Sequence, residues 1–189
     1  MPAPKLQSRV TNYAGKFIKY ETLTWTDATG KERLWETVER ARELPAVMMI
    51  PFFKPSNTLL LVREYRPPVD NLVIEFPAGL MEKGETPAVA AIREMQEETG
   101  YACRVVEVLP PTCNTPGLSS EANYQVWVEI DDDAPCAPQP DEGEFIENIV
   151  LPRADIAAFI RRELEKNSVF DSRVMAFLRG MLAGRQEQS

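Results

Sequence analysis

The stretch from Gly79 to Tyr101 constrains the fold of this 189-residue chain more than any other. Both ends of a helix are marked within it. Thr86 is a suitable N-cap, Pro87 is tolerated in a first helical turn, and Gly100 suits a left-handed C-terminal cap. The stretch therefore predicts a helix over 87–99.

The predicted helix has two chemically different faces at 100° per residue. We expect the apolar side to face the core, and it comprises Ala88, Ala91, Ile92 and Met95. Glu94, Glu97 and Glu98 fall on nearly the opposite side. Like charges one turn apart and anions in a last turn are each locally unfavourable. Local rules that are broken together in one place often mark a functional site.

A divalent cation would offset this repulsion. The chain contains no histidine, which excludes Ser-His and Cys-His nucleophiles and histidine-ligated zinc. Carboxylate oxygens favour a hard ion, so we expect Mg²⁺, with Mn²⁺ as an alternative. A solvated acidic helix face is the competing interpretation of the three glutamates alone.

The wider stretch resembles the Nudix box, G-x5-E-x7-R-E-U-x-E-E-x-G-U, in which U is a bulky apolar residue. Met95 and Tyr101 occupy the bulky positions, and residues of the required type fill every fixed position: Gly79, Glu85, Arg93, Glu94, Glu97, Glu98 and Gly100. The resemblance implies an α+β Nudix fold, in which a mixed β-sheet is sandwiched between α-helices and carries an N-terminal β-hairpin appendage.

The resemblance also implies roles for the box residues. Glu94, Glu97 and Glu98 are expected to act in catalysis by binding the metal, together with the backbone carbonyl of Ala78. Arg93 and Glu85 are expected to tie the loop to the helix, and Gly79 and Gly100 to be structural. The family's reaction is attack of water on a phosphorus of a diphosphate bridge. Glu144 is the candidate general base, and a solvated loop carboxylate is its alternative interpretation.

Three segments outside the box resemble the ADP-ribose and ADP-sugar pyrophosphatases: 63–68 (REYRPP), 74–79 (IEFPAG) and 115–119 (TPGLS). The resemblance extends from about residue 16 to 151. It implies hydrolysis of ADP-ribose or an ADP-sugar to AMP and a sugar phosphate. The alternatives are GDP-mannose or another nucleoside diphosphate derivative as substrate. A non-catalytic nucleotide-binding regulator is a further alternative, but such a protein would be expected to have lost box glutamates.

The substrate-binding residues follow from the same resemblance. Arg66 and Arg40 would meet phosphate or ribose oxygens, Trp35 would stack on adenine and Glu36 would accept from its amine. Phe17 stands where relatives often carry tryptophan, and Thr115 stands where they often carry aspartate. The full set is Phe17, Trp35, Glu36, Arg40, Arg66, Ala78, Leu80 and Thr115.

The sequence predicts an N-terminal β-hairpin, residues 1–43, ahead of a hydrolase domain, residues 44–189. Its strands are expected over 16–26 and 32–42, with a turn at 27–31. A two-stranded hairpin is marginally stable alone. The resemblance implies a homodimer in which this appendage is exchanged and serves both dimerisation and adenine binding.

The rest of the sequence predicts a sheet with helices. Strands are expected over 46–53, 58–64, 72–76, 104–109, 123–130 and 145–151, and further helices over 153–166 and 172–183.

Composition limits the partners and the compartment. The net charge of −8 argues against a nucleic-acid partner. No apolar run approaches the roughly 20 residues of a membrane span, and the N-terminus lacks a signal-peptide core. Three cysteines without close pairing indicate reduced thiols, so we expect a cytoplasmic protein acting on a small nucleoside diphosphate sugar.

Overall fold

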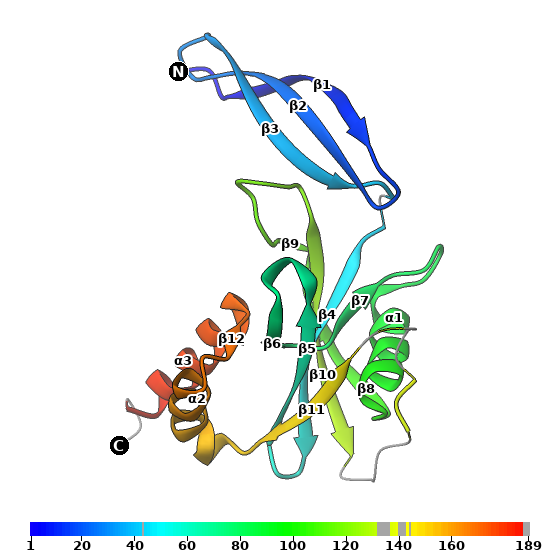
Figure 1. Ribbon diagram of the computed structural model, residues 1–189, viewed down its shortest axis with the longest axis vertical. Helices are drawn as coiled ribbons and strands as arrows, with labels where there is room; N and C mark the ends of the chain where they lie inside the picture. Colours follow the sequence, from blue (N-terminus) through cyan, green and yellow to red (C-terminus); the bar gives the residue numbers. More distant parts are fainter. Residues whose placement is uncertain (43, 132–136, 140–142, 144, 187–189) are drawn as a thin grey trace. The chain divides into compact units, whose positions relative to one another are not determined.

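The computed structural model describes residues 1–42, 44–131, 137–139, 143 and 145–186. The described residues form two compact units. The N-terminal unit consists of residues 1–46 and 110–124, and the main unit consists of residues 47–109 and 125–189. Figure 1 shows the elements of both.

The N-terminal unit is built on an antiparallel sheet with the strand order β1-β2-β3. Its strands are β1 (Lys5–Ala14), β2 (Ile18–Thr26) and β3 (Glu32–Arg40). Strands β2 and β3 pair from Ile18 opposite Arg40 to Thr26 opposite Glu32. This pairing confirms the predicted hairpin.

Strand β1 adds to the predicted hairpin, and sequence reasoning missed it. All of its residues are exposed, so it has no buried apolar face to produce an alternating pattern. Irregularities between Leu6 and Ser8 and between Thr11 and Tyr13 interrupt what alternation there is. Strand β1 is therefore recognised by its pairing with β2 and not by its amino-acid composition.

The segment 110–124 also belongs to the N-terminal unit. It contains β9 (Thr112–Cys113), which pairs with the first residues of β10 (Ala122–Asp131). Two donors of β3 bond to the carbonyl of Leu118: the backbone N–H of Val38 at 3.0 Å and the hydroxyl of Thr37 at 2.8 Å. This unit therefore contains 110–124 in addition to the N-terminal residues.

The main unit contains a mixed sheet whose path runs β12-β6-β5-β4-β10-β8, with β11 paired to β5 and β7 paired to β4. Strand β12 is parallel to β6, whereas β5 pairs antiparallel with β6 and β11. The strands not yet given bounds are β4 (Ala46–Lys54), β5 (Leu59–Arg66), β6 (Asn71–Glu75), β7 (Ala78–Leu80), β8 (Cys103–Val108), β11 (Ile146–Leu151) and β12 (Val169–Phe170).

Helices cover both faces of this sheet, with α2 and α3 on one side and α1 on the other (Figure 1). They are α1 (Pro87–Glu94), the π-helical turn η2 (Met95–Thr99), α2 (Ile156–Glu165) and α3 (Ser172–Gln186), with short 3-10 turns η1 (Pro67–Val69) and η3 (Arg153–Asp155). The predicted sheet sandwiched between helices is confirmed. Within the described residues, no helix is both long enough and apolar enough to cross a membrane.

Alternation along β4 explains why both faces are covered. Met48 and Ile50 join a buried cluster with residues of α2 and α3, such as Phe159. Val47 and Met49 are fully buried but lie outside that cluster. Successive strand residues point to opposite faces, so the side chains of Val47 and Met49 pack on the face of the sheet that carries α1.

Candidate active site

The caps of the box helix are those that the sequence predicts. The Thr86 hydroxyl accepts from the backbone N–H of Val89 at 3.3 Å, and Pro87 occupies the first turn. Gly100 ends the helix with a φ of 76°, where its N–H donates to the carbonyl of Gln96. A side chain at Gly100 would be strained, because positive φ favours glycine.

The faces of the helix differ from the prediction in two ways. Ile92, expected in the core, is 41% exposed, whereas Ala91 and Met95 are completely buried. Glu98, expected on the far side, is only 9% exposed. From Met95 onward the turn is π-helical, with i→i+5 bonding, so angles taken at 100° per residue no longer hold there.

The carboxylate of Glu94 lies directly against the backbone of Gly79. A Cβ atom built at Gly79 would come within 2.0–2.3 Å of three atoms of that carboxylate. The space that Glu94 occupies therefore exists because residue 79 has no side chain.

The other two box glutamates occupy different environments. Glu98 accepts from the backbone N–H of Ala78 at 3.2 Å, which fixes its carboxylate to the start of β7. The side chain of Glu97 is 44% exposed. The carboxylates of Glu94 and Glu98 therefore lie partly enclosed beside the backbone of residues 78–79, whereas that of Glu97 faces outward.

Arg93 connects the loop to the helix. Its guanidinium donates to both oxygens of Glu85 at 2.8 and 2.9 Å and to the carbonyl of Leu80 at 3.0 Å. Its Nη1 donates to Glu94 at 2.8 Å and to Glu97 at 2.9 Å. The hydrogen bonds from Arg93 lower the pKa of the Glu85 carboxyl to about 2, so Glu85 stays ionised near neutral pH.

Arg66, at the end of β5, is held by two carboxylates. Nη1 contacts Glu64 at 2.8 Å, while Nε and Nη2 donate to one oxygen of Glu75 at 3.0 and 2.6 Å. Burial acts to lower the pKa of Arg66, but Glu75, Glu64 and Glu98 together outweigh it and raise that pKa. Arg66 is therefore cationic and electrostatically coupled to the box.

Sequence reasoning missed Glu64 and Glu75 as residues of this site. Glu64 and Arg66 are two apart on a strand, a spacing that puts both on one face and offered a detectable signal. Glu75 comes from β6, where it lies opposite Val62 of β5, and the long side chain of Arg66 reaches it from four residues away.

Trp35 and Glu36 point to opposite faces of the N-terminal sheet, because they are consecutive residues of β3. The indole N–H of Trp35 donates to the carbonyl of Gly117 at 3.3 Å, and its side chain remains partly exposed. Glu36 accepts from the hydroxyl of Tyr20 at 2.5 Å. Sequence reasoning had not connected Tyr20 with Glu36.

The remaining predicted residues of the N-terminal unit lie at its surface. Phe17 is 72% exposed, with the ammonium of Lys16 4.9 Å from its ring centroid. Arg40 is paired with Glu121. The hydroxyl of Thr115 shares a hydrogen bond with Ser119 at 3.2 Å.

Glu144, the expected general base, lies outside the described residues. The described stretch 137–139, which comes earlier in the same segment, contacts the box helix. There the backbone N–H of Gln139 donates to the carbonyl of Glu97 at 2.8 Å.

The ligand atoms at this site are of the type that a hard divalent ion prefers, because Glu94 and Glu98 place carboxylate oxygens beside the loop backbone. Among the described residues, no three Asp, Glu, His or Cys side chains are placed so that they could hold an ion. The contacts of Arg93 with Glu94 and Glu97 account for part of this, since they direct those oxygens toward a guanidinium.

Comparison with known families decides the class of protein. The NUDIX domain model matches residues 42–174, which is more than half of the chain and includes the whole box helix. The chain belongs to the Nudix hydrolase family.

Named relatives of this Nudix hydrolase extend over most of its length. A Mus musculus protein named ADP-sugar pyrophosphatase is 39% identical over 175 residues, covering 86% of this chain and 80% of the mouse protein. A Saccharomyces cerevisiae protein named ADP-ribose pyrophosphatase is 30% identical over 183 residues, covering 90% and 79%. This Nudix hydrolase is therefore similar to nucleotide-sugar pyrophosphatases well beyond the box.

A solved structure supports the fold. The crystal structure of an ADP compounds hydrolase superposes with a TM-score of 0.71 at 22% identity and covers 98% of this chain and 97% of that one. At this identity the likeness applies to the fold alone.

Proposed function

We propose that this Nudix hydrolase cleaves the diphosphate bond of ADP-ribose or an ADP-sugar in a Mg²⁺-dependent reaction, giving AMP and a sugar phosphate. The observation that carries the proposal is that the Glu98 carboxylate is fixed by the Ala78 backbone N–H and contributes to raising the pKa of Arg66. The main unit thereby offers oxygen donors for a hard cation and a guanidinium for phosphate that is electrostatically coupled to them. The names of the mouse and yeast relatives support the class of substrate.

In this proposal Glu94, Glu97, Glu98 and the carbonyl of Ala78 hold Mg²⁺, for which Mn²⁺ can substitute. A bound divalent ion neutralises phosphate oxygens and lowers the pKa of a water molecule. Arg93 holds the box loop in place through Glu85 and Leu80.

The chain's own residues have three further tasks. Arg66 binds a phosphate oxygen, held for this task by Glu64 and Glu75. Glu144 accepts the proton of the attacking water. Trp35, Glu36 and Phe17 bind adenine, Arg40 meets phosphate or ribose oxygens, and Thr115 and Leu80 are further substrate-binding residues.

The test is a product assay with ADP-ribose, ADP-glucose, GDP-mannose and an oxidised deoxyguanosine triphosphate, each with Mg²⁺ and with excess chelator. We expect AMP from the first two substrates and no cleavage with chelator. Preference for GDP-mannose or the triphosphate would overturn the substrate assignment. Turnover that persists with chelator would overturn the metal assignment.

Glu98→Gln gives a sharper test, because glutamine can still accept from the Ala78 N–H and so preserves the local fold. We expect turnover to fall about 100-fold or more, with an unchanged melting temperature. The matched control is Glu165→Gln, an exposed carboxylate at the end of α2, which should behave as wild type. Loss of folding in Glu98→Gln would show that this carboxylate serves stability instead.

The same assay tests Glu144. If it is the general base, Glu144→Gln should lower kcat while changing KM little. Unchanged kcat would assign Glu144 to the solvated loop instead.

A further inference from the structure

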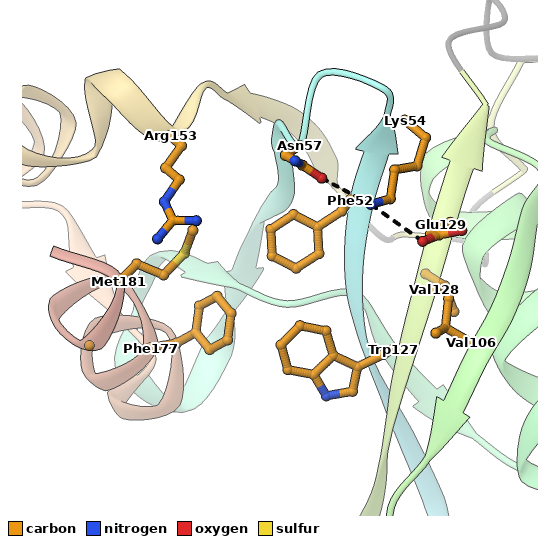
Figure 2. Close-up of a pocket in the computed structure, with 11 residues that line it drawn as sticks. Phe52, Lys54, Asn57, Val106, Trp127, Val128, Glu129, Arg153, Phe177 and Met181 are labelled. Carbon is orange, nitrogen blue, oxygen red and sulfur yellow. Dashed lines mark hydrogen bonds and ion pairs between the residues drawn. The ribbon is translucent and has the colours of Figure 1, made fainter. Parts of the chain in front are cut away.

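A cavity of about 590 Å³ lies in the main unit, on the face of the sheet that carries α3. Three aromatic residues form its walls: Phe52 on β4, Trp127 on β10 and Phe177 on α3 (Figure 2). The lining residues include none of the Nudix box. Its volume lies within the roughly 300–1,000 Å³ of small-molecule sites.

The aromatic rings are arranged to accept another planar group. Phe52 and Trp127 stack with centroids 5.7 Å apart and planes 12° apart. Phe177 is tilted by 58° against Trp127 at 5.9 Å. All three side chains are only half-buried, so parts of their faces remain open toward the cavity. Aromatic groups prefer offset-stacked or tilted neighbours at such distances.

Gly180 of α3 keeps the cavity open on the helix side. It lines the cavity, and a Cβ atom built at this position would meet nothing within 4 Å. A larger side chain would therefore enter free space without displacing packed atoms.

The charge at the cavity favours an anion. Its lining contains the cations Lys54 and Arg153 and one carboxylate, Glu129. Glu129 is already paired with Lys54 at 3.5 Å and also with Arg104. The lining is therefore cationic in a chain whose net charge is −8.

Two hydrogen-bond donors at the cavity have no acceptor among the described residues. Figure 2 shows the guanidinium of Arg153 turned toward the space beside Phe52 and Met181. Neither this guanidinium nor the indole N–H of Trp127 donates to any described residue. A guanidinium suits a carboxylate or phosphate because it can offer two parallel N–H donors.

We propose that this cavity is a second ligand site, which binds a small molecule with a planar aromatic body and one anionic group. The ring stacks against Trp127 and Phe52, and the anionic group accepts from Arg153. The site is separate from the Nudix box, so ligand binding here does not depend on the proposed hydrolysis.

The experiment measures binding of three indole probes of similar shape to the full chain by calorimetry. These are indole-3-acetate, the neutral indole-3-acetamide and the cationic tryptamine. We expect indole-3-acetate to bind at least about fivefold more tightly than the amide, and tryptamine to bind most weakly. Equal affinities for the three probes would overturn the proposed anion selectivity.

Matched variants locate the binding. Arg153→Gln should reduce the preference for the anionic probe over the amide, whereas Arg161→Gln, an exposed arginine outside the lining, should not. Gly180→Leu should weaken binding by projecting a side chain into the cavity. Gly184→Leu is the control on the same helix, because Gly184 has equally open surroundings but does not line the cavity. Wild-type affinity in Gly180→Leu would overturn the proposal.

NMR of the indole N–H signals separates this site from other locations. The expected result is that indole-3-acetate shifts the Trp127 signal and leaves those of Trp25 and Trp35 in place. A shift of Trp35 instead would place the probe in the proposed nucleotide site. A Trp127 signal that changes with protein concentration, together with a doubled mass by light scattering and no response to the probes, would identify the cavity as a contact between copies. Either result would overturn the proposal.

Discussion

At Gly79, the absence of a side chain determines where a carboxylate can lie. A Cβ atom would occupy the place of the Glu94 carboxylate, which is the end of a flexible side chain. The backbone could therefore keep its path if a methyl group were added, while the carboxylate would have to leave. We therefore infer that glycine at position 79 is needed to place the Glu94 carboxylate more than to stabilise the fold.

We predict that Gly79→Ala lowers turnover of ADP-ribose about tenfold or more, while the melting temperature changes by only a few degrees. The reason is displacement of a proposed metal ligand without damage to the core. Gly184→Ala is the control, because its Cβ would meet nothing and alanine stabilises a helix by roughly 0.5–1 kcal/mol over glycine. Steady-state kinetics and thermal unfolding measure both effects. Wild-type turnover in Gly79→Ala would show that the position of Glu94 is not critical.

The contacts of Arg66 depend on the planar shape of its guanidinium. One nitrogen contacts Glu64 and the two others donate to Glu75. A lysine ammonium is a point charge that cannot reproduce this planar arrangement. We predict that Arg66→Lys raises the KM for ADP-ribose about tenfold. Arg33→Lys, which alters an exposed pair with Asp27, should leave the KM unchanged. An unchanged KM in Arg66→Lys would remove Arg66 from substrate binding.

Site residues could be predicted from the sequence where they stand at fixed spacings within a known motif. The fixed positions of the box singled out Glu94 and Glu98, but their burial depended on the π-helical turn, which carries no spacing signal of its own. Glu75 was missed because it lies on another strand, opposite Val62, and contacts Arg66 only through the reach of the arginine side chain. Contacts between strands require a register that local patterns do not contain.

At the scale of elements, hydrophobic periodicity identified the strands that have a buried face and the helices that cover them. Strand β1 was missed because it is exposed along its whole length. One charged group that sequence reasoning passed over joins α2 to the sheet. Glu163 is 1% exposed and contacts Arg63 of β5 at 2.9 Å, Ser168 at 2.9 Å and Lys166 at 3.2 Å.

We predict that Glu163→Gln lowers the free energy of unfolding by about 1.5–3 kcal/mol at pH 7, because buried donors lose an ionised acceptor. Burial acts to raise the pKa of Glu163, but hydrogen bonds from Ser168, Lys166 and Arg162 outweigh it and lower that pKa. A lowered folded-state pKa gives a stability contribution that is complete above the ordinary glutamate value of about 4.3. The contribution disappears as pH falls through the folded-state value.

The difference in unfolding free energy between wild type and Glu163→Gln should therefore be constant from pH 7 to about 5 and decline below about 4.3. Urea titrations at several pH values measure it. Glu165→Gln, with an exposed side chain, should show no such difference. A difference that grows on acidification would contradict the assigned role of Glu163.

At the scale of the whole molecule, we propose a homodimer with an exchanged N-terminal hairpin, in which residues of both chains serve one substrate molecule. The support is the exposed apolar surface of the N-terminal unit, which includes Val10, Ile18 and Leu34. Exposed apolar groups in such number favour burial against another surface. Sequence reasoning could propose this exchange only from family resemblance, because nothing in a single chain specifies its partner.

Mixing two inactive variants tests the exchange. Trp35→Ala removes the proposed adenine contact in the N-terminal unit, and Glu98→Gln removes a box carboxylate. If each site uses residues of both chains, a mixed dimer contains one intact site. Random reassociation should then restore about a quarter of wild-type turnover. A mixture of Glu94→Gln with Glu98→Gln should restore nothing. A light-scattering mass of 21.4 kDa, that of one chain, at full activity would rule out the dimer.

The inclusion of residues 110–124 in the N-terminal unit limits how this protein can be shortened. The chain passes between the two units at 46/47, at 109/110 and again at 124/125. A truncated protein that starts at residue 47 would keep the Leu118 carbonyl but lose Thr37 and Val38, which donate to it. A single cut therefore cannot detach the first sheet cleanly, and any shortened variant would need a redesigned 110–124 loop.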